Sequence, residues 1–282
     1  MKILLVGGNS SLAAVLSNSL LRFAEVFTAG RSNCDIELDM SWGVQEFDLP
    51  NGLDCVVNLS AHFGGSDFDS ILGAEEVNAI GSLKLADASM RAGVTHFVQI
   101  SSIFVELANE SPLHNAYSLS KRHAEELLRL YGENSGISIL ILRPSRIFGE
   151  GETFRRHQPL LYALLDQAQD NQDIILNGSN DALRNFIHVQ DVAEIVSRAI
   201  RLRLQGIFQC ASTSNLRISE IAQAAIAACE SSSKVSFNNS SSDIPDNFLE
   251  VDDHLFRLVQ YFPEVSLEEG LSREVQRRRE LS

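Results

Sequence analysis

Tyr117 and Lys121 are the two side chains whose types and spacing most directly predict chemistry. They are four residues apart, which places a phenol and an ammonium group on the same face of a helix. A tyrosine hydroxyl has an ordinary pKa of about 10 and is a poor acid or base at neutral pH. A neighbouring ammonium group stabilises the phenolate, so it brings the pKa of the tyrosine toward the working range. The pair therefore predicts proton exchange with an oxygen of a substrate.

Ser102 offers a third polar group to the same reaction. The serine pair Ser101-Ser102 directly follows an apolar run, residues 96–100, that has the composition of a strand covered on both faces. Open α/β sheets bind ligands at the carboxyl ends of their strands. We therefore expect the Ser102 hydroxyl to orient a carbonyl group beside Tyr117.

A glycine turn follows the first apolar run of the chain. Residues 2–6 lead into Gly7-Gly8-Asn9-Ser10-Ser11-Leu12-Ala13, and a helical pattern follows. Such a turn presents backbone N–H groups at a helix N-terminus, where the helix dipole favours a pyrophosphate. Compared with the pattern Gly-x-x-Gly-x-x-Gly, Ser10 and Ala13 replace the second and third glycines. We expect Gly7, Ser10, Ser11 and Leu12 to contact a dinucleotide. The alternative is a tight strand-to-helix connection that binds nothing.

The end of the second predicted strand indicates which dinucleotide that would be. The acidic residue that usually reads the adenosine ribose is missing, and the sequence there is Thr28-Ala29-Gly30-Arg31-Ser32. A guanidinium group pairs well with phosphate, so Arg31 and Ser32 could hold a 2′-phosphate. We therefore expect NADP(H) rather than NAD(H). NAD(H) remains open, because Arg31 could equally be an ordinary exposed arginine.

A frame of strands and helices must bring these residues together, and the first half of the chain predicts one. Short apolar runs predict strands at residues 2–6, 25–28, 36–38, 54–59, 96–100 and 138–142. Helical patterns cover residues 11–23, 71–92 and 117–132. Gly93 is expected to stop a helix, and Gly132 and Gly136 to lie in the turn before the strand at 138. This alternation predicts an α/β fold with a Rossmann-like, doubly wound parallel sheet.

The sequence changes in character after Arg143-Pro144, which predicts a second, small lobe interleaved with the sheet. Residues 183–212 return to a strand-then-helix pattern and a further strand. We therefore expect residues 1–148, rejoined by about 183–212, to form the dinucleotide-binding domain. Residues 149–182 and 213–282 would form a C-terminal substrate-binding lobe. The charged tail at 273–280 is expected to be a solvated helix end.

Composition excludes several classes of protein. Of the 282 residues, 44% are hydrophobic and 21% charged, the balance of a globular protein with a sizeable core. The net charge of −14 would repel a phosphate backbone, so nucleic-acid binding is not expected. The cysteines lack the paired spacing of a zinc site or disulfide framework, so we expect free thiols and no metal site. No apolar run is long enough for a membrane span or a signal peptide, so we expect a cytoplasmic protein.

Taken together, these motifs resemble those of the extended short-chain dehydrogenase/reductases of the NAD(P)-dependent epimerase/dehydratase type. The resemblance covers nearly the whole length and includes Ser102, Tyr117 and Lys121 as a catalytic triad. Further matching segments are residues 54–61, Asn78 with its neighbours 77–81, and residues 142–149, 184–193 and 262–270. The departures are Ser10 and Ala13 in the glycine turn, and Glu106 where a Tyr-Gly pair usually follows the serines.

The resemblance implies a role for each matching residue. Tyr117 would exchange the proton of the substrate oxygen, Lys121 would hold the nicotinamide ribose, and Ser102 would hydrogen-bond the reacting oxygen. Asp39 would contact the adenine, and further residues would line the dinucleotide: Leu59, Ser60, Ala61, Pro144 and, in the helix after the fourth strand, Asn78. The family often dimerises through the helices that correspond to residues 71–92 and 117–132. A homodimer would then use apolar contacts from Leu72, Leu83, Leu127 and Leu128.

The residues after Ser102 narrow the reaction that the resemblance implies. Sugar-nucleotide dehydratases of the family have an Asp-Glu pair there, and the combined epimerase-reductases have a cysteine. Here Ile103-Phe104 follows, and neither side chain can do acid–base work. A 4-keto reductase and a 4-epimerase need only the triad and the dinucleotide, so both remain open. The interpretation of Arg31 favours the reductase, which consumes NADPH.

The substrate that the resemblance implies is a nucleoside-diphosphate sugar. Arg146, Arg155, Arg156 and Arg184 are local positive charges in an acidic chain, and we expect Arg146 and Arg184 to hold the diphosphate. Two other functions stay open: a non-catalytic NADP(H)-sensing protein on the same fold, and a reductase of a non-sugar ketone. Sensors usually lose the tyrosine or the lysine, and both are kept here. A ketone reductase would have a largely apolar lobe without those arginines.

Overall fold

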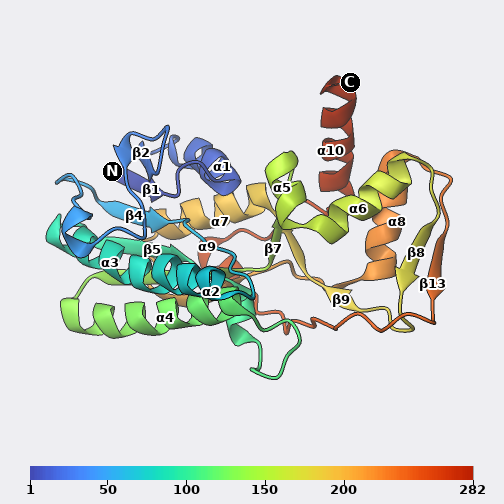
Figure 1. Cartoon of the computed structure of the whole chain (residues 1–282). Helices are drawn as coiled ribbons and strands as arrows, with labels where there is room; N and C mark the ends of the chain where they lie inside the picture. The colour runs from blue at the N-terminus through green and yellow to red at the C-terminus, as the bar shows by residue number, and fades with distance from the viewer. Residues whose placement is uncertain (282) are drawn as a thin grey trace. The chain divides into compact units, whose positions relative to one another are not determined.

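The computed structural model describes residues 1–281, and the chain divides into two compact units (Figure 1). Unit 1 consists of Met1–Pro144 and Ala193–Cys210. Unit 2 consists of Ser145–Val192 and the chain from Ala211 onward. The expected boundaries were 148, about 183 and 212, so residues 145–148 and 183–192, expected with the sheet, lie in unit 2.

A seven-stranded parallel sheet is the centre of unit 1. Its strands lie in the order β11-β6-β5-β4-β1-β2-β3, and every neighbouring pair is parallel. Their bounds are β1 Lys2–Val6, β2 Glu25–Gly30, β3 Ile36–Glu37, β4 Cys55–Asn58, β5 His96–Ile100, β6 Ser138–Pro144 and β11 Gly206–Cys210. The strand order reverses at β1, which lies between β2 and β4. Doubly wound sheets bind ligands beside such a reversal, at the carboxyl ends of the strands.

Helices cover both faces of this sheet. They are α1 Ser11–Leu20, α2 Phe68–Ala74, α3 Gly81–Arg91, α4 Ala116–Ser135 and α7 Val189–Arg201. Figure 1 shows α2, α3 and α4 together on one face, and α1 and α7 on the other. Leu4, Val56 and Phe97, in three central strands, are completely buried. This explains why these strands are continuous apolar runs and not alternating ones.

Unit 2 is built from short helices and paired short strands. Its helices are α5 Glu152–His157, α6 Pro159–Gln169, α8 Ile218–Cys229, α9 His254–Val259 and α10 Leu267–Leu281. Its strands pair as β7 Arg146–Phe148 with β10 Phe186–His188, β9 Leu183–Arg184 with β12 Leu216–Arg217, and β8 Ile174–Asn177 with β13 Val235–Asn238. Buried Leu161 and Leu165 on α6 and Ala225 on α8 contribute to its own core.

The structure confirms the expected fold class, and three local expectations are wrong. Gly132 lies inside α4, and Gly136, in the left-handed conformation with φ +77°, follows its last residue. The helix expected at 71–92 begins earlier, in α2, and a π-helical segment, Glu75–Ile80, separates α2 from α3. The charged tail forms α10, but Glu274 and Val275 on it are buried, so one face of this helix packs against the protein.

The state of the cysteines and the lengths of the helices bear on two expectations from composition. All four cysteines are free thiols, as expected, and Cys55 and Cys210 are buried. Among residues 1–281, no helix is long and apolar enough to cross a membrane.

Candidate active site

The structure brings Ser102, Tyr117 and Lys121 together in unit 1. Ser102 follows β5, and its Oγ accepts a hydrogen bond from the backbone N–H of Phe104 at 3.3 Å. The Ser102 side chain also hydrogen-bonds the side chain of Tyr117. Lys121 lies one turn further along α4, and its Nζ donates to the carbonyl oxygen of Ile100 at 3.0 Å. The three side chains therefore converge on the carboxyl end of β5.

The start of α4 fixes the position of Tyr117. Asn115 caps this helix: its Oδ1 accepts from the N–H of Ser118 at 3.1 Å, and the Ser118 hydroxyl accepts from the N–H of Asn115 at 3.0 Å. Gly64, with φ +72°, packs so closely that a Cβ there would lie 3.2 Å from the Tyr117 nitrogen. The ring of Phe63 stacks on that of Tyr117, with centroids 5.3 Å apart. The helix cap and this loop thus hold the phenol from two sides.

Burial controls the acidity of Tyr117. It raises the pKa of the phenol to about 12, and the hydrogen bond with Ser102 has a smaller, opposite effect. The expectation that Lys121 brings this pKa toward neutrality is wrong for the protein alone, because the cost of desolvating the phenolate dominates. At neutral pH the hydroxyl is therefore protonated, and it can donate a proton.

Lys121 is almost completely buried, with 2% of its surface exposed. Its Nζ donates to the carbonyl oxygens of Ser60, at 3.1 Å, and Ile100, at 3.0 Å. Burial lowers the pKa of Lys121 to about 8, and the carboxylate of Glu125 opposes this change. At neutral pH the ammonium group thus joins the ends of β4 and β5 beside the triad.

A buried ion pair behind Lys121 is a feature that the sequence analysis missed. Glu125 lies one turn beyond Lys121 on α4, and its Oε1 accepts a hydrogen bond from the Ser101 hydroxyl at 2.5 Å. Two nitrogens of Arg143, in β6, donate to the same carboxylate at 3.0 and 2.5 Å. Glu125 therefore connects α4 to the ends of β5 and β6. The spacing of four residues, repeated from Tyr117 to Lys121 to Glu125, is the signal that would have found it.

The glycine turn after β1 fits a dinucleotide pyrophosphate. Gly7 has φ +85°, and a Cβ there would lie 2.9 Å from the backbone nitrogen of Ser60, so only glycine fits. Ser10 caps α1, because its Oγ accepts from the N–H of Ala13 at 3.2 Å. The N–H groups of Ser11 and Leu12, in the first turn of the helix, have no intrahelical partner, and such groups bind anions. The close packing at Gly7 and the N–H groups of Ser11 and Leu12 together fit the pyrophosphate of a nicotinamide dinucleotide.

The segment after β2 lies beside this turn, because β1 and β2 are parallel neighbours. The carbonyl oxygen of Ser32 accepts a hydrogen bond from the Asn9 side chain at 2.6 Å. Arg31 is exposed. The Asp39 carboxylate accepts hydrogen bonds from the N–H and hydroxyl of Ser41, at 2.9 and 2.8 Å. Arg31 and Ser32 thus follow β2 beside the glycine turn, and Asp39 stabilises its own turn.

Asn58, which the sequence analysis did not select, organises the end of β4. Its Nδ2 donates to Ser82 and to Gln99, at 2.9 and 3.0 Å, and its Oδ1 accepts from the N–H of Ser60 at 3.0 Å. A polar residue in an otherwise apolar strand was the signal. Among the other expected dinucleotide contacts, Leu59 and Pro144 are buried and Ala61 is exposed.

The amide of Asn78 is used within the protein. It lies in the π-helical segment, accepts from the N–H of His62 at 2.8 Å and donates to the His62 carbonyl at 2.7 Å. It also donates to the Ser120 hydroxyl at 2.9 Å. Asn78 therefore fixes the loop that carries Phe63.

Arg146 and Arg184 lie near each other in unit 2. Burial and, to a smaller extent, the charge of Arg184 together lower the pKa of Arg146 to about 10. Arg184 donates to the carbonyl oxygens of Leu183 and Pro245, at 2.7 and 2.8 Å. Buried guanidinium groups that repel each other favour a multiply charged anion. Arg155, by contrast, forms an ion pair with Asp166 at 2.6 Å.

Curated proteins with similar sequences carry names of nucleotide-sugar enzymes. The chain is 24% identical over 149 residues to CDP-abequose synthase of Salmonella typhimurium, which covers 53% of this chain and 48% of that protein. It is 28% identical over 177 residues to dTDP-4-dehydro-6-deoxy-D-allose reductase of a Streptomyces species, covering 56% and 53%. The chain thus spans about half the length of these relatives.

Fold and family comparisons cover more of the chain. The structure of UDP-N-acetylglucosamine 4-epimerase from Bacillus cereus is similar over 99% of both chains, with a TM-score of 0.81 and 19% identity, which establishes the shared fold. A family model described as the NAD dependent epimerase/dehydratase family matches residues 3–211. Because this match extends from β1 through β11 and includes the converging triad, the chain belongs to the NAD dependent epimerase/dehydratase family.

Proposed function

We propose that this chain is an NAD(P)-dependent enzyme that acts on a nucleotide-activated sugar, by 4-keto reduction or 4-epimerisation. The observation that carries the proposal is the convergence of Ser102, Tyr117 and Lys121 at the end of β5. The glycine turn in the same unit supports it, because that turn fits a dinucleotide. The names of the curated relatives support the substrate class.

In this proposal, different residues of unit 1 bind the dinucleotide, donate the proton and orient the substrate oxygen. Gly7, Ser11 and Leu12 would hold the dinucleotide, which supplies or accepts a hydride when bound. Tyr117 donates its proton to the substrate oxygen during reduction, because burial keeps the phenol protonated. Ser102 orients the same oxygen, and the charge of Lys121 stabilises the phenolate that remains.

The surroundings of Ser102 argue against a dehydratase. Removing water from a sugar needs an acid and a base beside the triad. Ile103 is buried and apolar, and Phe104 carries no titratable group. Between the remaining reactions we favour reduction, because Arg31 is our candidate for a 2′-phosphate contact and a reductase consumes NADPH.

Arg146 and Arg184 are our candidates for binding the substrate diphosphate. Arg184 is buried and Arg146 is half-buried, and they form a pair of neighbouring cations in a chain of net charge −14. Bidentate guanidinium contacts are well suited to phosphate oxygens. A reductase of a non-sugar ketone would have no use for this pair.

The test is incubation with a panel of nucleotide sugars and their 4-keto forms while NADPH absorbance is followed. Net oxidation identifies a reductase, and product change without net oxidation identifies an epimerase. Turnover of simple ketones alone would establish the non-sugar reductase. Dinucleotide binding with no turnover of any of these compounds would contradict an enzyme and favour the sensor.

We propose NADP(H) as the preferred cofactor, with Arg31 and Ser32 at the 2′-phosphate. Arg31→Ala should raise the KM for NADPH about tenfold, because one charge-assisted contact is lost, and leave the KM for NADH nearly unchanged. Steady-state kinetics with both cofactors measure this. A wild-type preference for NADH would refute the assignment.

We also propose a homodimer through the helices that cover residues 71–92 and 117–132, which are α2, the π-helical segment, α3 and α4. Phe68, Ile71 and Leu72 on α2 and Ile80 in the π-helical segment are exposed large apolar side chains. Leu128, one of the residues expected at this contact, is instead completely buried in the core, because it faces the sheet from α4. Light scattering of the wild-type protein should give twice the mass of one chain, and light scattering of Ile71→Glu should give the mass of a single chain. A monomeric wild-type protein would disprove the dimer.

A further inference from the structure

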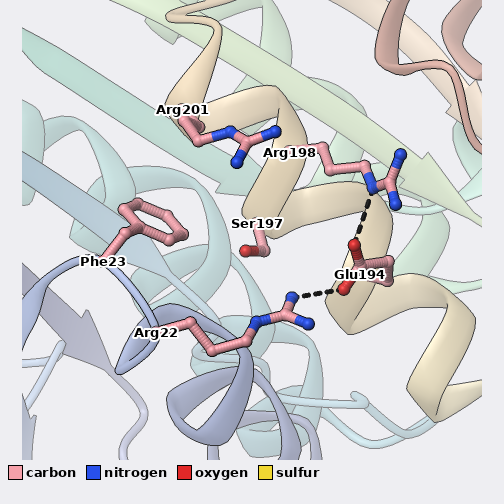
Figure 2. Close-up of a pocket in the computed structure, with 6 residues that line it drawn as sticks. All are labelled: Arg22, Phe23, Glu194, Ser197, Arg198 and Arg201. Carbon is pink, nitrogen blue, oxygen red and sulfur yellow. Dashed lines mark hydrogen bonds and ion pairs between the residues drawn. The ribbon is translucent and has the colours of Figure 1, made fainter.

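A cavity of about 300 Å³ lies in unit 1, away from the triad and the glycine turn (Figure 2). Arg22 and Phe23, just after α1, line one side of it. Glu194, Ser197, Arg198 and Arg201, on α7, line the other. The glycine turn is at the opposite end of α1, a helix of ten residues that is about 15 Å long. The cavity is therefore a separate site.

Three guanidinium groups and one carboxylate line this cavity, and two of the three bind the carboxylate. Oε2 of Glu194 accepts a short hydrogen bond from Arg22, and Oε1 accepts from Nε of Arg198 at 2.6 Å. Burial raises the pKa of Glu194, but the two arginine contacts together outweigh it and lower the pKa below its usual value, so the carboxylate is ionised at neutral pH. Arg201 forms no ion pair with any residue of the described chain, 1–281. The cavity therefore has a net charge of about +2 in a strongly acidic protein.

The helix alone accounts for part of this charge. Arg198 and Arg201 lie in the last turn of α7, where the negative end of the helix dipole stabilises cations. That effect does not explain why a third arginine, from a different segment, faces the same space. It also does not explain the ring of Phe23, which adds a flat apolar wall (Figure 2). Convergent cations and an aromatic wall around a cavity are the features of a ligand site.

We propose that this cavity binds a nucleoside monophosphate. Guanidinium groups bind phosphate oxygens through paired hydrogen bonds, and the Ser197 hydroxyl adds a further donor on the cavity wall. The Phe23 ring offers a stacking face for a base. The volume is at the lower end of the range for small-molecule sites, which suits one base and one phosphate better than a whole dinucleotide.

The test is a titration of the full chain with uridine monophosphate at constant ionic strength, followed by the amide NMR signals of Phe23 and Ser197. Saturable shifts of these signals are expected. Arg201→Gln should weaken the affinity about tenfold, because its guanidinium contacts are lost. The matched control is Arg129→Gln, which removes the same charge from an exposed ion pair on α4 and should leave the affinity unchanged.

Glu194→Gln should change the affinity in the opposite direction. It removes the only carboxylate of the cavity lining, so the nucleotide should bind more tightly. Shifts confined to Ser11 and Leu12 would place the nucleotide at the glycine turn and overturn the proposal. Equal affinity of inorganic phosphate and the nucleotide would overturn the role of Phe23 and of the base. Equal affinity of wild type and Arg201→Gln would overturn the site.

Discussion

Tyr117→Phe should reduce turnover about 10²- to 10⁴-fold, the range for the loss of a general acid. The substitution removes only the hydroxyl. The ring remains in place against Phe63, where the two centroids are 5.3 Å apart, so the loop and the helix start should not move. Dinucleotide affinity and the midpoint of thermal unfolding should therefore stay near the wild-type values. Single-turnover kinetics with NADPH, together with calorimetry, measure both parts.

Tyr131→Phe is the matched control for this prediction. Tyr131 lies on the same helix, burial raises its pKa to about 12 as well, and its hydroxyl donates to Asp87 at 3.0 Å. Its loss should cost about 1 kcal/mol of stability and no activity. Full function of Tyr117→Phe in a cellular assay would contradict the enzyme and favour a sensor that uses the dinucleotide as a signal.

Glu125→Leu should have the largest effect on stability, lowering the free energy of unfolding by about 3 kcal/mol. It leaves the Arg143 guanidinium half-buried without its main partner and the Ser101 hydroxyl without an acceptor. The figure is at the low end of the range for broken buried pairs because Arg143 keeps some contact with water and with Glu106. The urea midpoint measures the loss.

Two comparisons make the Glu125 prediction specific. Glu126→Leu changes the next residue of α4, which is exposed, and should shift stability by less than about 0.5 kcal/mol. Adding Arg143→Met to Glu125→Leu should recover part of the loss, because no unpaired charge then remains. A urea midpoint for Glu125→Leu equal to that of wild type would show that the pair contributes nothing.

The elements that sequence predicted best are those whose signal is local. β1 and β5 have the expected bounds because strands covered on both faces are largely apolar runs. The approach of Tyr117 to Lys121 follows from helix spacing alone. The π-helical segment has no such signal, because it is stabilised by Asn78 contacting His62 and Ser120, which are far away in the sequence.

The direction of the Tyr117 pKa was mispredicted for a similar reason. Spacing shows that a lysine is near the phenol, but it does not show how deeply either group is buried. Burial is a property of the whole unit, since it depends on β4, β5 and the loop that carries Phe63. The spacing after Lys121 places the Glu125 carboxylate on the same face of α4, but it does not reveal the partner, Arg143, which comes from β6.

The return of the chain to unit 1 has a consequence for biosynthesis. β11 pairs with β6, from Gly206 beside Leu140 to Cys210 beside Pro144, but residues 145–192 must be synthesised between them. During synthesis, unit 1 therefore has only six of its seven strands until β11 emerges from the ribosome, and β6 is an unpaired edge of the sheet. Unpaired strand edges are sites of aggregation. Nascent chains that stop before β11 should accordingly depend on chaperones, whereas chains that have emerged past Cys210 should not.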